Sequence, residues 1–376
     1  MRKIRVLFEV YLLYHLPQFL PLYEVLRRDG RYELFFSAGG HSDEERCRTV
    51  EVLRSESLDV IEGETEQERF DAIDNRDIDV LIVGWGRRGY IDRIAQRRPR
   101  PVVIMIYHGI GVKASYFRDN NPRVDYRAVE SPYRVRQLRK HGVAARPLLC
   151  GCVKLDPLYR TTPFDRTEIL LGLGLDPELP TILYAPTYYP SSIRVLAGEL
   201  GRATTGWNVV VKPHNYTRFH PDYADDLAIL TSVARECSHV TIVPDSWYNI
   251  LPLFHAADLL ISDASSVMFE YLPLDRPIVV VTKHYLYPRH RLFPFFYRRN
   301  RIDSETLSYR DFYDRVSRPG DLRKTIQENL ARPDRLGPQR KRAHDELLHF
   351  SDGRAALRLK EEIERIVSSG EAHGHR

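Results

Sequence analysis

The segment DLLISDASSVMFEYLPLDRPIVVV, residues 258–281, decides the fold of this chain. Residues 259–261 and 278–281 are short apolar runs with the length of buried parallel strands. Between them, residues 267–272 carry apolar side chains at helical spacing, and two prolines mark the exit from this helix. A strand, a turn, a helix and a second strand in this order predict a parallel α/β sheet.

The turn between the first strand and the helix carries the chemistry. Ser265 and Ser266 place two hydroxyls beside the N–H groups that the first turn of a helix leaves without intrahelical partners. Hydroxyl donors, backbone donors and the positive end of the helix dipole together favour a phosphate. Serine is also a common helix cap, so the motif by itself leaves both roles open.

Length and composition indicate a two-domain globular protein. A chain of 376 residues is too long for one small core, and its apolar and charged fractions are ordinary. The net charge of +5 fits an acidic substrate or an anionic surface and gives no indication of nucleic-acid binding. The four cysteines lack metal-ligand spacing, which favours a reducing cytosol.

The N-terminal region gives two expectations about membranes. Residues 2–10 read as a short charged strand rather than a signal peptide, and no apolar run is long enough to span a bilayer. Residues 11–28, YLLYHLPQFLPLYEVLRR, predict either a helix packed on a sheet or an amphipathic surface that touches a membrane or a lipid-linked acceptor. In the second case Arg27 and Arg28 form its polar end. We expect a cytoplasmic protein at the cytoplasmic face of the membrane.

Strands alternate with helices in two series. The first series is expected at residues 4–8, 34–37, 60–61, 80–83, 102–107, 128–129 and 148–149. The second is expected at residues 181–184, 209–211, 240–243, 259–261 and 278–281. This alternation predicts two Rossmann-like, doubly wound parallel-sheet domains in a GT-B-like α/β fold with an interdomain cleft.

The predicted domain boundaries follow from composition. The stretch 153–180 is rich in proline and is expected to contain the linker. We expect an acceptor-side domain over 1–155, a nucleotide-donor domain over 156–350, and a terminal segment over 351–376. That terminal segment has a helix at about 354–367, with Leu357, Leu359, Ile363, Ile366 and Val367 on or near one face, followed by a disordered tail.

Polar residues follow four of the predicted strands, where ligands of open α/β sheets bind. They are His108 with Gly109, the run 185–187, Lys212 with His214, and the run 263–266. Each signal is weak alone, since a single histidine after a strand is more often structural. Four of them in one chain indicate a site.

Several segments resemble the CDP-glycerol glycerophosphotransferase family of teichoic-acid and capsule synthesis, over roughly residues 100–365. They are YHGIGVK (107–113), GCVKLD (151–156), YAPTYY (184–189), KPH (212–214), SDASSVMFEYLPLDRPIV (262–279) and SDGRA (351–355). The block 262–279 is the most diagnostic and is close to intact. The resemblance implies transfer of a polyol phosphate, glycerol phosphate first of all, from a CDP-linked donor to a hydroxyl acceptor with release of CMP.

The resemblance also implies roles for individual residues. His108 would be the general base that takes the proton of the acceptor hydroxyl. His214 and Lys212 would neutralise charge on the transferred and leaving phosphates, and Ser265 and Ser266 would bind the pyrophosphate. Phosphoryl transfer depends mainly on positioning and electrostatic stabilisation, so we expect neither a metal ion nor a cofactor besides the CDP-polyol substrate. No carboxylate cluster suited to Mg²⁺ stands out in the sequence.

Three further side chains are candidates with open alternatives. Glu270 is expected to meet ribose hydroxyls, as helix acids do in GT-B nucleotide sites. Asp263 either orders the turn before the serines or joins the site. Lys113 either contacts an acceptor phosphate or is a solvated loop lysine.

The sequence departs from the family pattern at four places. Ile110 replaces a small hydroxyl residue, the pair Tyr188 and Tyr189 stands where many members have arginine, and residues 153–154 replace Pro-Arg. The aromatic and basic run 283–299 does not match the family well, and it could be a membrane-facing loop, an acceptor clamp or a packed loop. These departures leave the identity of the polyol open.

Other functions compete with polyol-phosphate transfer. They are a GT-B glycosyltransferase of cell-envelope synthesis, a sugar-nucleotide epimerase and a non-catalytic binding module. The expected partners are a nucleotide-activated polyol or sugar donor, a lipid-linked or polymer acceptor and the membrane surface, but no nucleic acid. Release of CMP, release of UDP, net isomerisation, or nucleotide binding without turnover would distinguish the four functions.

Overall fold

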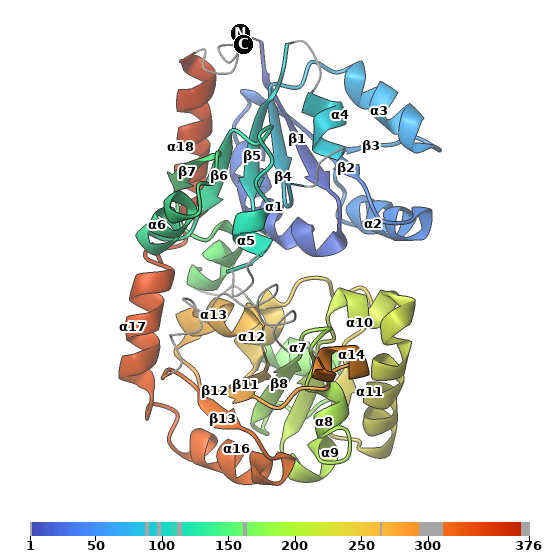
Figure 1. Ribbon diagram of the computed structural model, residues 1–376, viewed down its shortest axis with the longest axis vertical. Coiled ribbons are helices and arrows are strands. Elements are labelled where there is room, and N and C mark those ends of the chain that lie inside the picture. Colours follow the sequence, from blue (N-terminus) through green and yellow to red (C-terminus); the bar gives the residue numbers. More distant parts are fainter. Residues whose placement is uncertain are drawn as a thin grey trace. The chain divides into compact units, whose positions relative to one another are not determined.

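The structure is a computed structural model that describes residues 2–86, 90–95, 99–107, 109–110, 115–160, 164–263, 265–292 and 311–369. The chain divides into two compact units. Unit 1 comprises residues 1–108, 116–159 and 346–376, and unit 2 comprises residues 109–115 and 160–345. Each unit is built on one parallel sheet with helices (Figure 1). The predicted fold class, two Rossmann-like parallel-sheet domains of GT-B type, is confirmed, whereas the cleft stays a prediction.

Unit 1 contains a seven-stranded sheet in the order β3-β2-β1-β4-β5-β6-β7, in which all neighbours are parallel. The strands are β1 (Ile4–Val10), β2 (Tyr32–Ala38), β3 (Val60–Ile61), β4 (Val80–Val83), β5 (Val102–Ile106), β6 (Tyr126–Val129) and β7 (Arg146–Leu149). All seven were expected from their apolar residues, although in the two edge strands only Ile61 of β3 and Leu148 of β7 are buried. The order reverses between β1 and β4, which is the switch point of this sheet.

The helices of unit 1 include residues 11–28, for which the sequence left open a packed helix or a membrane-contacting surface. They are η1 (Leu13–His15), α1 (Leu16–Arg27), α2 (Asp43–Ser55), α3 (Glu66–Asp74), α4 (Tyr90–Ala95), α5 (Ser115–Arg118), α6 (Pro132–Lys140), η2 (Val153–Tyr159) and α18 (Ala355–Ser368). Helix α1 packs against β2, η2 and α18, and its Phe19, Leu22 and Leu26 are fully buried. The packed helix is therefore the correct alternative, because the apolar side chains of α1 lie in the core.

Unit 2 contains a six-stranded parallel sheet in the order β10-β9-β8-β11-β12-β13. The strands are β8 (Thr181–Ala185), β9 (Asn208–Val211), β10 (Val240–Ile242), β11 (Leu259–Ser262), β12 (Ile278–Val281) and β13 (Asp314–Val316). The sequence predicted the first five. It missed β13, a three-residue edge strand in which only Val316 is both apolar and buried.

The helices of unit 2 are short where prolines interrupt them. They are α7 (Arg166–Gly172), α8 (Ile193–Leu196), α9 (Leu200–Ala203), α10 (Asn215–Phe219), η3 (Pro221–Tyr223), α11 (Ala224–Glu236), α12 (Leu251–Ala256), α13 (Val267–Glu270), η4 (Leu272–Leu274), α14 (Pro288–Leu292), η6 (Pro319–Asp321), α16 (Leu322–Ala331) and, reaching the unit boundary, α17 (Gly337–Leu347). The helix predicted at 267–272 is divided into α13 and the 3₁₀ turn η4, because Pro273 cannot donate a backbone hydrogen bond.

The two units are not continuous in the sequence: residues 109–115 group with unit 2, and the terminal helix groups with unit 1. The chain crosses from unit 1 to unit 2 between Tyr159 and Arg160, within the predicted linker 153–180. Residues 346–376 belong to unit 1 rather than to a separate segment. Helix α18 buries Leu359, Ile363 and Ile366 as expected, but Leu357 lies outside the buried face and is 39% exposed.

Helix α18 is capped by a side chain that is distant in the sequence. The Asp156 carboxylate accepts hydrogen bonds from the backbone N–H groups of Ala355, at 3.0 Å, and Ala356, at 2.8 Å. Burial raises the pKa of Asp156, and these two hydrogen bonds act against that rise. The residue at the usual capping position, Arg354, makes no side-chain cap. Two of the family-like segments, 151–156 and 351–355, therefore meet to fix the last helix.

Replacing Asp156 with alanine should lower the free energy of unfolding by about 1–3 kcal/mol, because two buried N–H groups lose their acceptor. Urea denaturation followed by circular dichroism measures this change. Asp345→Ala is the matched control, since it breaks surface contacts of an exposed carboxylate with Lys341 and His344 and should change stability by less than about 1 kcal/mol. Equal stability of the two variants would show that the cap contributes nothing.

Candidate functional site

Three of the four predicted strand-end signals lie at one edge of the unit 2 sheet. Strands β9, β8 and β11 are neighbours and parallel, so the segments 212–214, 185–192 and 263–266 follow their carboxyl ends side by side. This is the edge at which open α/β sheets bind ligands. Two predicted residues, His108 and Lys113, lie outside the described residues.

Asp263 organises this edge from a fully buried position. Its Oδ1 accepts a hydrogen bond from the backbone N–H of Thr187 at 2.8 Å. Its Oδ2 accepts hydrogen bonds from the backbone N–H of Ser192 at 3.0 Å and from the Ser192 hydroxyl at 2.9 Å. Burial raises the pKa of Asp263, and the nearby His284 and these hydrogen bonds act against the rise. These contacts tie the end of β11 to the loop after β8 and are those of a turn-ordering residue.

The side chains of Ser265 and Ser266 stand at the start of α13, half-buried. Ser266 precedes the helix, but its side chain makes no capping hydrogen bond. Only its backbone carbonyl is engaged, accepting from Phe269 N at 3.0 Å and Glu270 N at 3.2 Å. Within the described part of the chain neither hydroxyl makes a hydrogen bond, so helix capping does not account for this pair of serines.

The helix that follows the serines is too short to supply much of a dipole. Helix α13 has only four residues before the chain enters η4. A macrodipole is the sum of aligned peptide dipoles, so one helical turn contributes little of it. The expected dipole contribution is therefore smaller than the sequence suggested, and the hydroxyls and the free N–H groups of the first turn remain as donors.

The residue that follows His108 in the chain packs against these donors. Gly109 belongs to unit 2, and a Cβ atom added to it would lie 2.9 Å from Ser266 Oγ and 3.4 Å from Glu270 Oε1. A distance under 3.0 Å means that a side chain at position 109 would displace the Ser266 hydroxyl, so Gly109 lies in close contact with this serine. Glu270 itself is 1% exposed. The contact brings Gly109 and the serine turn together, which no pattern in the sequence indicated.

Lys212 and His214 follow β9, and the structure fixes the tautomer of the histidine. Lys212 is buried, and its backbone N–H donates to the Tyr184 carbonyl at 2.9 Å. His214 caps α10 by accepting the Tyr216 N–H on Nδ1 at 3.1 Å. A ring nitrogen that accepts a hydrogen bond carries no proton, so the neutral imidazole holds its proton on Nε2. His214 therefore presents an N–H donor, which suits contact with a phosphate oxygen.

The two tyrosines that depart from the family pattern have different surroundings. The Tyr188 ring lies 4.8 Å from the His214 ring and 4.9 Å from the Tyr216 ring, centroid to centroid. The Tyr189 ring instead stacks on Tyr287 at 4.7 Å, and its hydroxyl contacts His290 Nδ1 at 2.5 Å. Tyr188 thus packs beside a predicted catalytic residue, whereas Tyr189 holds the start of the run 283–299. Residues 293–299 lie outside the described residues, and the three alternatives for this run stay predictions.

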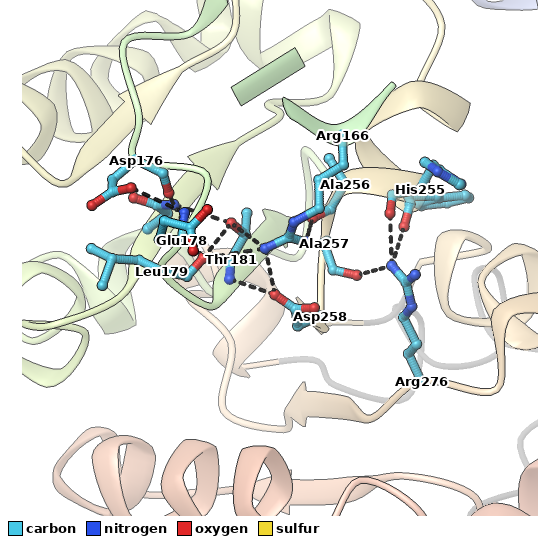
Figure 2. A network of polar contacts seen from close by, with 12 residues as sticks. Arg166, Asp176, Glu178, Leu179, Thr181, His255, Ala256, Ala257, Asp258 and Arg276 are labelled. Atoms are coloured by element: carbon cyan, nitrogen blue, oxygen red, sulfur yellow. Dashed lines mark hydrogen bonds and ion pairs between the residues drawn. The ribbon is translucent and has the colours of Figure 1, made fainter. Parts of the chain in front are cut away.

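Much of the diagnostic block 262–279 stabilises the fold. Figure 2 shows Arg166 and Arg276 directed at the C-terminal end of α12. Arg276 Nη1 donates to the carbonyls of His255, at 2.7 Å, and Ala257, at 2.5 Å. Asp258, at the amino end of β11, accepts from Arg166 Nη2 at 2.9 Å. These contacts lie at the amino end of β11, the sheet edge opposite the candidate site, so Arg276 has a structural role within the block.

Two other features of the described residues bear on the sequence predictions. No group of three or more histidine, cysteine, aspartate or glutamate side chains is placed there to hold a metal ion. No described helix combines the length and the apolar character needed to cross a bilayer. The expectations of metal independence and of contact with a membrane surface both stay predictions.

The comparisons with known proteins agree on the fold and give one family. The family described as CDP-glycerol:poly(glycerophosphate) glycerophosphotransferase matches residues 90–365. The wall teichoic acid polymerase TagF is similar in structure, with 16% identity, a TM-score of 0.64, and 98% of this chain and 90% of that chain covered. No curated protein matches the sequence.

Two epimerases are also similar in structure. A putative UDP-N-acetylglucosamine 2-epimerase from Listeria monocytogenes has 14% identity and a TM-score of 0.64, with 98% of each chain covered. A UDP-GlcNAc 2-epimerase from Neisseria meningitidis bound to UDP-GlcNAc has 10% identity and a TM-score of 0.62, with 96% of this chain and 100% of that chain covered. At these identities the likenesses show the fold alone.

Replacing Asp263 with alanine should destabilise unit 2 by about 3 kcal/mol or more, because three donors lose a buried acceptor. Asp263→Asn should cost less, since the amide oxygen can still accept while its NH₂ group faces a donor. Chemical denaturation of both variants measures the difference. An alanine variant as stable as the wild type would contradict the ordering role.

Proposed function

The chain belongs to the CDP-glycerol:poly(glycerophosphate) glycerophosphotransferase family, and from this premise we propose that it transfers glycerol phosphate from CDP-glycerol to a hydroxyl of a lipid-linked saccharide or polymer. The family match covers 90–365, which includes every candidate site residue. Membership makes the protein an enzyme of the glycerophosphotransferase type. The donor, the acceptor and the residue roles that follow are our proposal.

The donor pyrophosphate binds at Ser265 and Ser266. The observation that carries this assignment is that both hydroxyls are half-buried at a ligand-binding sheet edge and make no hydrogen bond with the described protein. Polar groups in such a position usually have a partner, and phosphate oxygens are suitable acceptors. Lys212 follows β9, which is separated from β11 by β8, and it adds positive charge at the same edge of the sheet. Glu270, one helical turn on, is the proposed ligand of the ribose hydroxyls.

The transfer is a displacement at the phosphorus that carries the glycerol. The acceptor oxygen forms a new bond to this phosphorus, the bond to the bridging oxygen breaks, and CMP leaves with the electron pair. His108 takes the proton of the acceptor hydroxyl. The contact of Gly109 with Ser266 and Glu270 supports this role, because it brings the chain neighbour of His108 to the proposed donor site.

His214 acts as a hydrogen-bond donor rather than as a base. Its Nδ1 accepts the Tyr216 N–H, so the neutral ring carries its proton on Nε2. The role proposed for this N–H is to stabilise the charge that develops on a phosphate oxygen during transfer. Protonating Nδ1 as well would break the capping hydrogen bond. Tyr188, packed on the ring, holds its plane. Lys113 is the proposed contact of an acceptor phosphate, and location at the cytoplasmic face of a membrane stays a prediction.

Changing Ser265 and Ser266 together to alanine should weaken CDP-glycerol binding by about tenfold or more, because hydrogen bonds to a charged phosphate are lost. Isothermal titration calorimetry with CDP-glycerol measures the affinity. Ser232→Ala, which changes an exposed serine paired with Glu236 on α11, should bind as the wild type does. Unchanged affinity in the double variant would remove the pyrophosphate assignment.

Replacing His108 with alanine should reduce transfer by about 10²–10⁴-fold while leaving CDP-glycerol affinity nearly unchanged, because only the proton acceptor is removed. The assay follows released nucleoside phosphate with CDP-glycerol, CDP-ribitol and nucleotide sugars as donors. His141→Ala, at an exposed histidine of unit 1, serves as the control. Near-normal turnover of the His108 variant would refute the base assignment, and release of UDP instead of CMP would refute the donor.

A further inference from the structure

Unit 1 buries an arginine that has no counter-ion. In the described part of the chain, four arginine side chains are at most 2% exposed: Arg69, Arg127, Arg134 and Arg340. Three of them form ion pairs, with Glu9 at 3.3 Å, Glu130 at 2.8 Å and Asp275 at 2.7 Å respectively. Arg127 forms no ion pair with a described carboxylate. A guanidinium does not lose its proton in proteins, so this charge is held in the interior uncompensated by direct contact.

The unpaired part of Arg127 is the edge that binds oxyanions. Nη1 donates to the carbonyl of Tyr116 at 2.8 Å. Nε and Nη2 are fully buried and have no hydrogen-bond partner. These two nitrogens form the side of the guanidinium that presents two parallel N–H donors, which is the geometry that matches two oxygens of one phosphate or carboxylate.

The position of Arg127 in the sheet is that of a ligand-binding residue. It lies on β6, paired with Met105 of β5, and Figure 1 shows α5 next to the ends of these strands. Arg127 is the second of the four residues of β6, two residues before the carboxyl edge at which open α/β sheets bind ligands. Buried polar groups are normally hydrogen-bonded, so two N–H donors without an acceptor in the described protein indicate a binding role.

The charged groups around Arg127 do not fill this role. Asp119 is close enough to influence the arginine, but its Oδ2 accepts the Gly86 N–H at 2.7 Å, and it forms no ion pair with Arg127. Arg134 is engaged with Glu130 and Gln137. Burial lowers the pKa of Arg127, while Asp119, Tyr116 and Tyr107 act in the opposite direction. The site therefore carries two donors aimed at an acceptor that the described protein does not provide.

We propose that the Nε and Nη2 edge of Arg127 binds a phosphate group, and that this phosphate belongs to the acceptor of the transfer reaction. The first half stands on the geometry of unit 1 alone. The second half rests on the proposed function, in which the acceptor of a glycerophosphotransferase is itself a chain of phosphodiesters. Because the fork has no exposed surface, binding requires a local displacement of the residues that cover it.

The first test is calorimetric titration of the full chain with inorganic phosphate. The Ser265→Ala, Ser266→Ala double variant is used as background, so that the proposed donor site does not contribute. Arg127→Met in this background should lower phosphate affinity by about tenfold or more. Arg123→Gln, at a partly exposed arginine, makes the same change in net charge and should leave affinity unchanged. Phosphate binding that survives Arg127→Met would overturn the proposal.

Arg127→Lys keeps the test decisive if the methionine variant does not fold. Lysine retains the charge but not the two parallel donors, so phosphate affinity should again fall by about tenfold. A lysine variant that binds phosphate as tightly as the wild type would show that the fork is not a receptor. Circular dichroism confirms that each variant is folded before titration.

Steady-state kinetics decide whether the phosphate bound by Arg127 belongs to the acceptor or to the donor. With a glycerol phosphate oligomer as acceptor, Arg127→Lys should raise the KM of the acceptor and leave the KM of CDP-glycerol unchanged. A raised KM for CDP-glycerol instead would assign the phosphate to the donor and refute the second half. If the enzyme proves not to transfer glycerol phosphate at all, the phosphate titration still decides whether Arg127 is a receptor.

Discussion

The buried carboxylate of Asp263 is the interaction on which the donor edge of unit 2 depends. It accepts three hydrogen bonds from the loop after β8 while standing directly after β11. Two strand ends are thereby held in one arrangement, and Ser265 and Ser266 follow in a fixed turn. A carboxylate with no exposure is stable there only because donors surround it. The phosphate-binding hydroxyls of the proposal are thus positioned by an acid that need not touch the ligand.

Similar long-range polar contacts account for much of what makes the family-like segments recognisable. Asp156 caps a helix that begins about two hundred residues later, and Arg276 binds the carbonyls at the end of α12. Both are charged residues in motifs, and both stabilise the fold away from the proposed site. The presence of a residue in a family-like motif therefore does not tell whether its role is structural or chemical. The surroundings of each side chain make that separation, as they do for Tyr188 beside His214 and Tyr189 beside Tyr287.

The proposed chemistry uses donors in fixed positions. His214 is held as an Nε2–H donor by its own capping hydrogen bond, and the serine hydroxyls stand without protein partners. Phosphoryl transfer needs little covalent participation from the protein, so donors of this kind suit it. Arg127 extends the same principle to unit 1, because a buried fork without a counter-ion is an oriented pair of donors. In the two proposals together, both units recognise phosphate, unit 2 through hydroxyls and unit 1 through a guanidinium.

The sequence alone determined the fold class, the strands except β13, and the sheet edge where the site lies, because buried strands and helix spacing leave local patterns. Chain patterns do not report contacts between distant residues. Hence only the tertiary structure showed that Asp263 orders the loop after β8, that Gly109 packs on Ser266 and that Leu357 lies outside the buried face. It also showed that no described carboxylate pairs with Arg127. Each depends on which side chains meet when segments far apart in the sequence come together, and hydrogen bonding and burial are decided at that point.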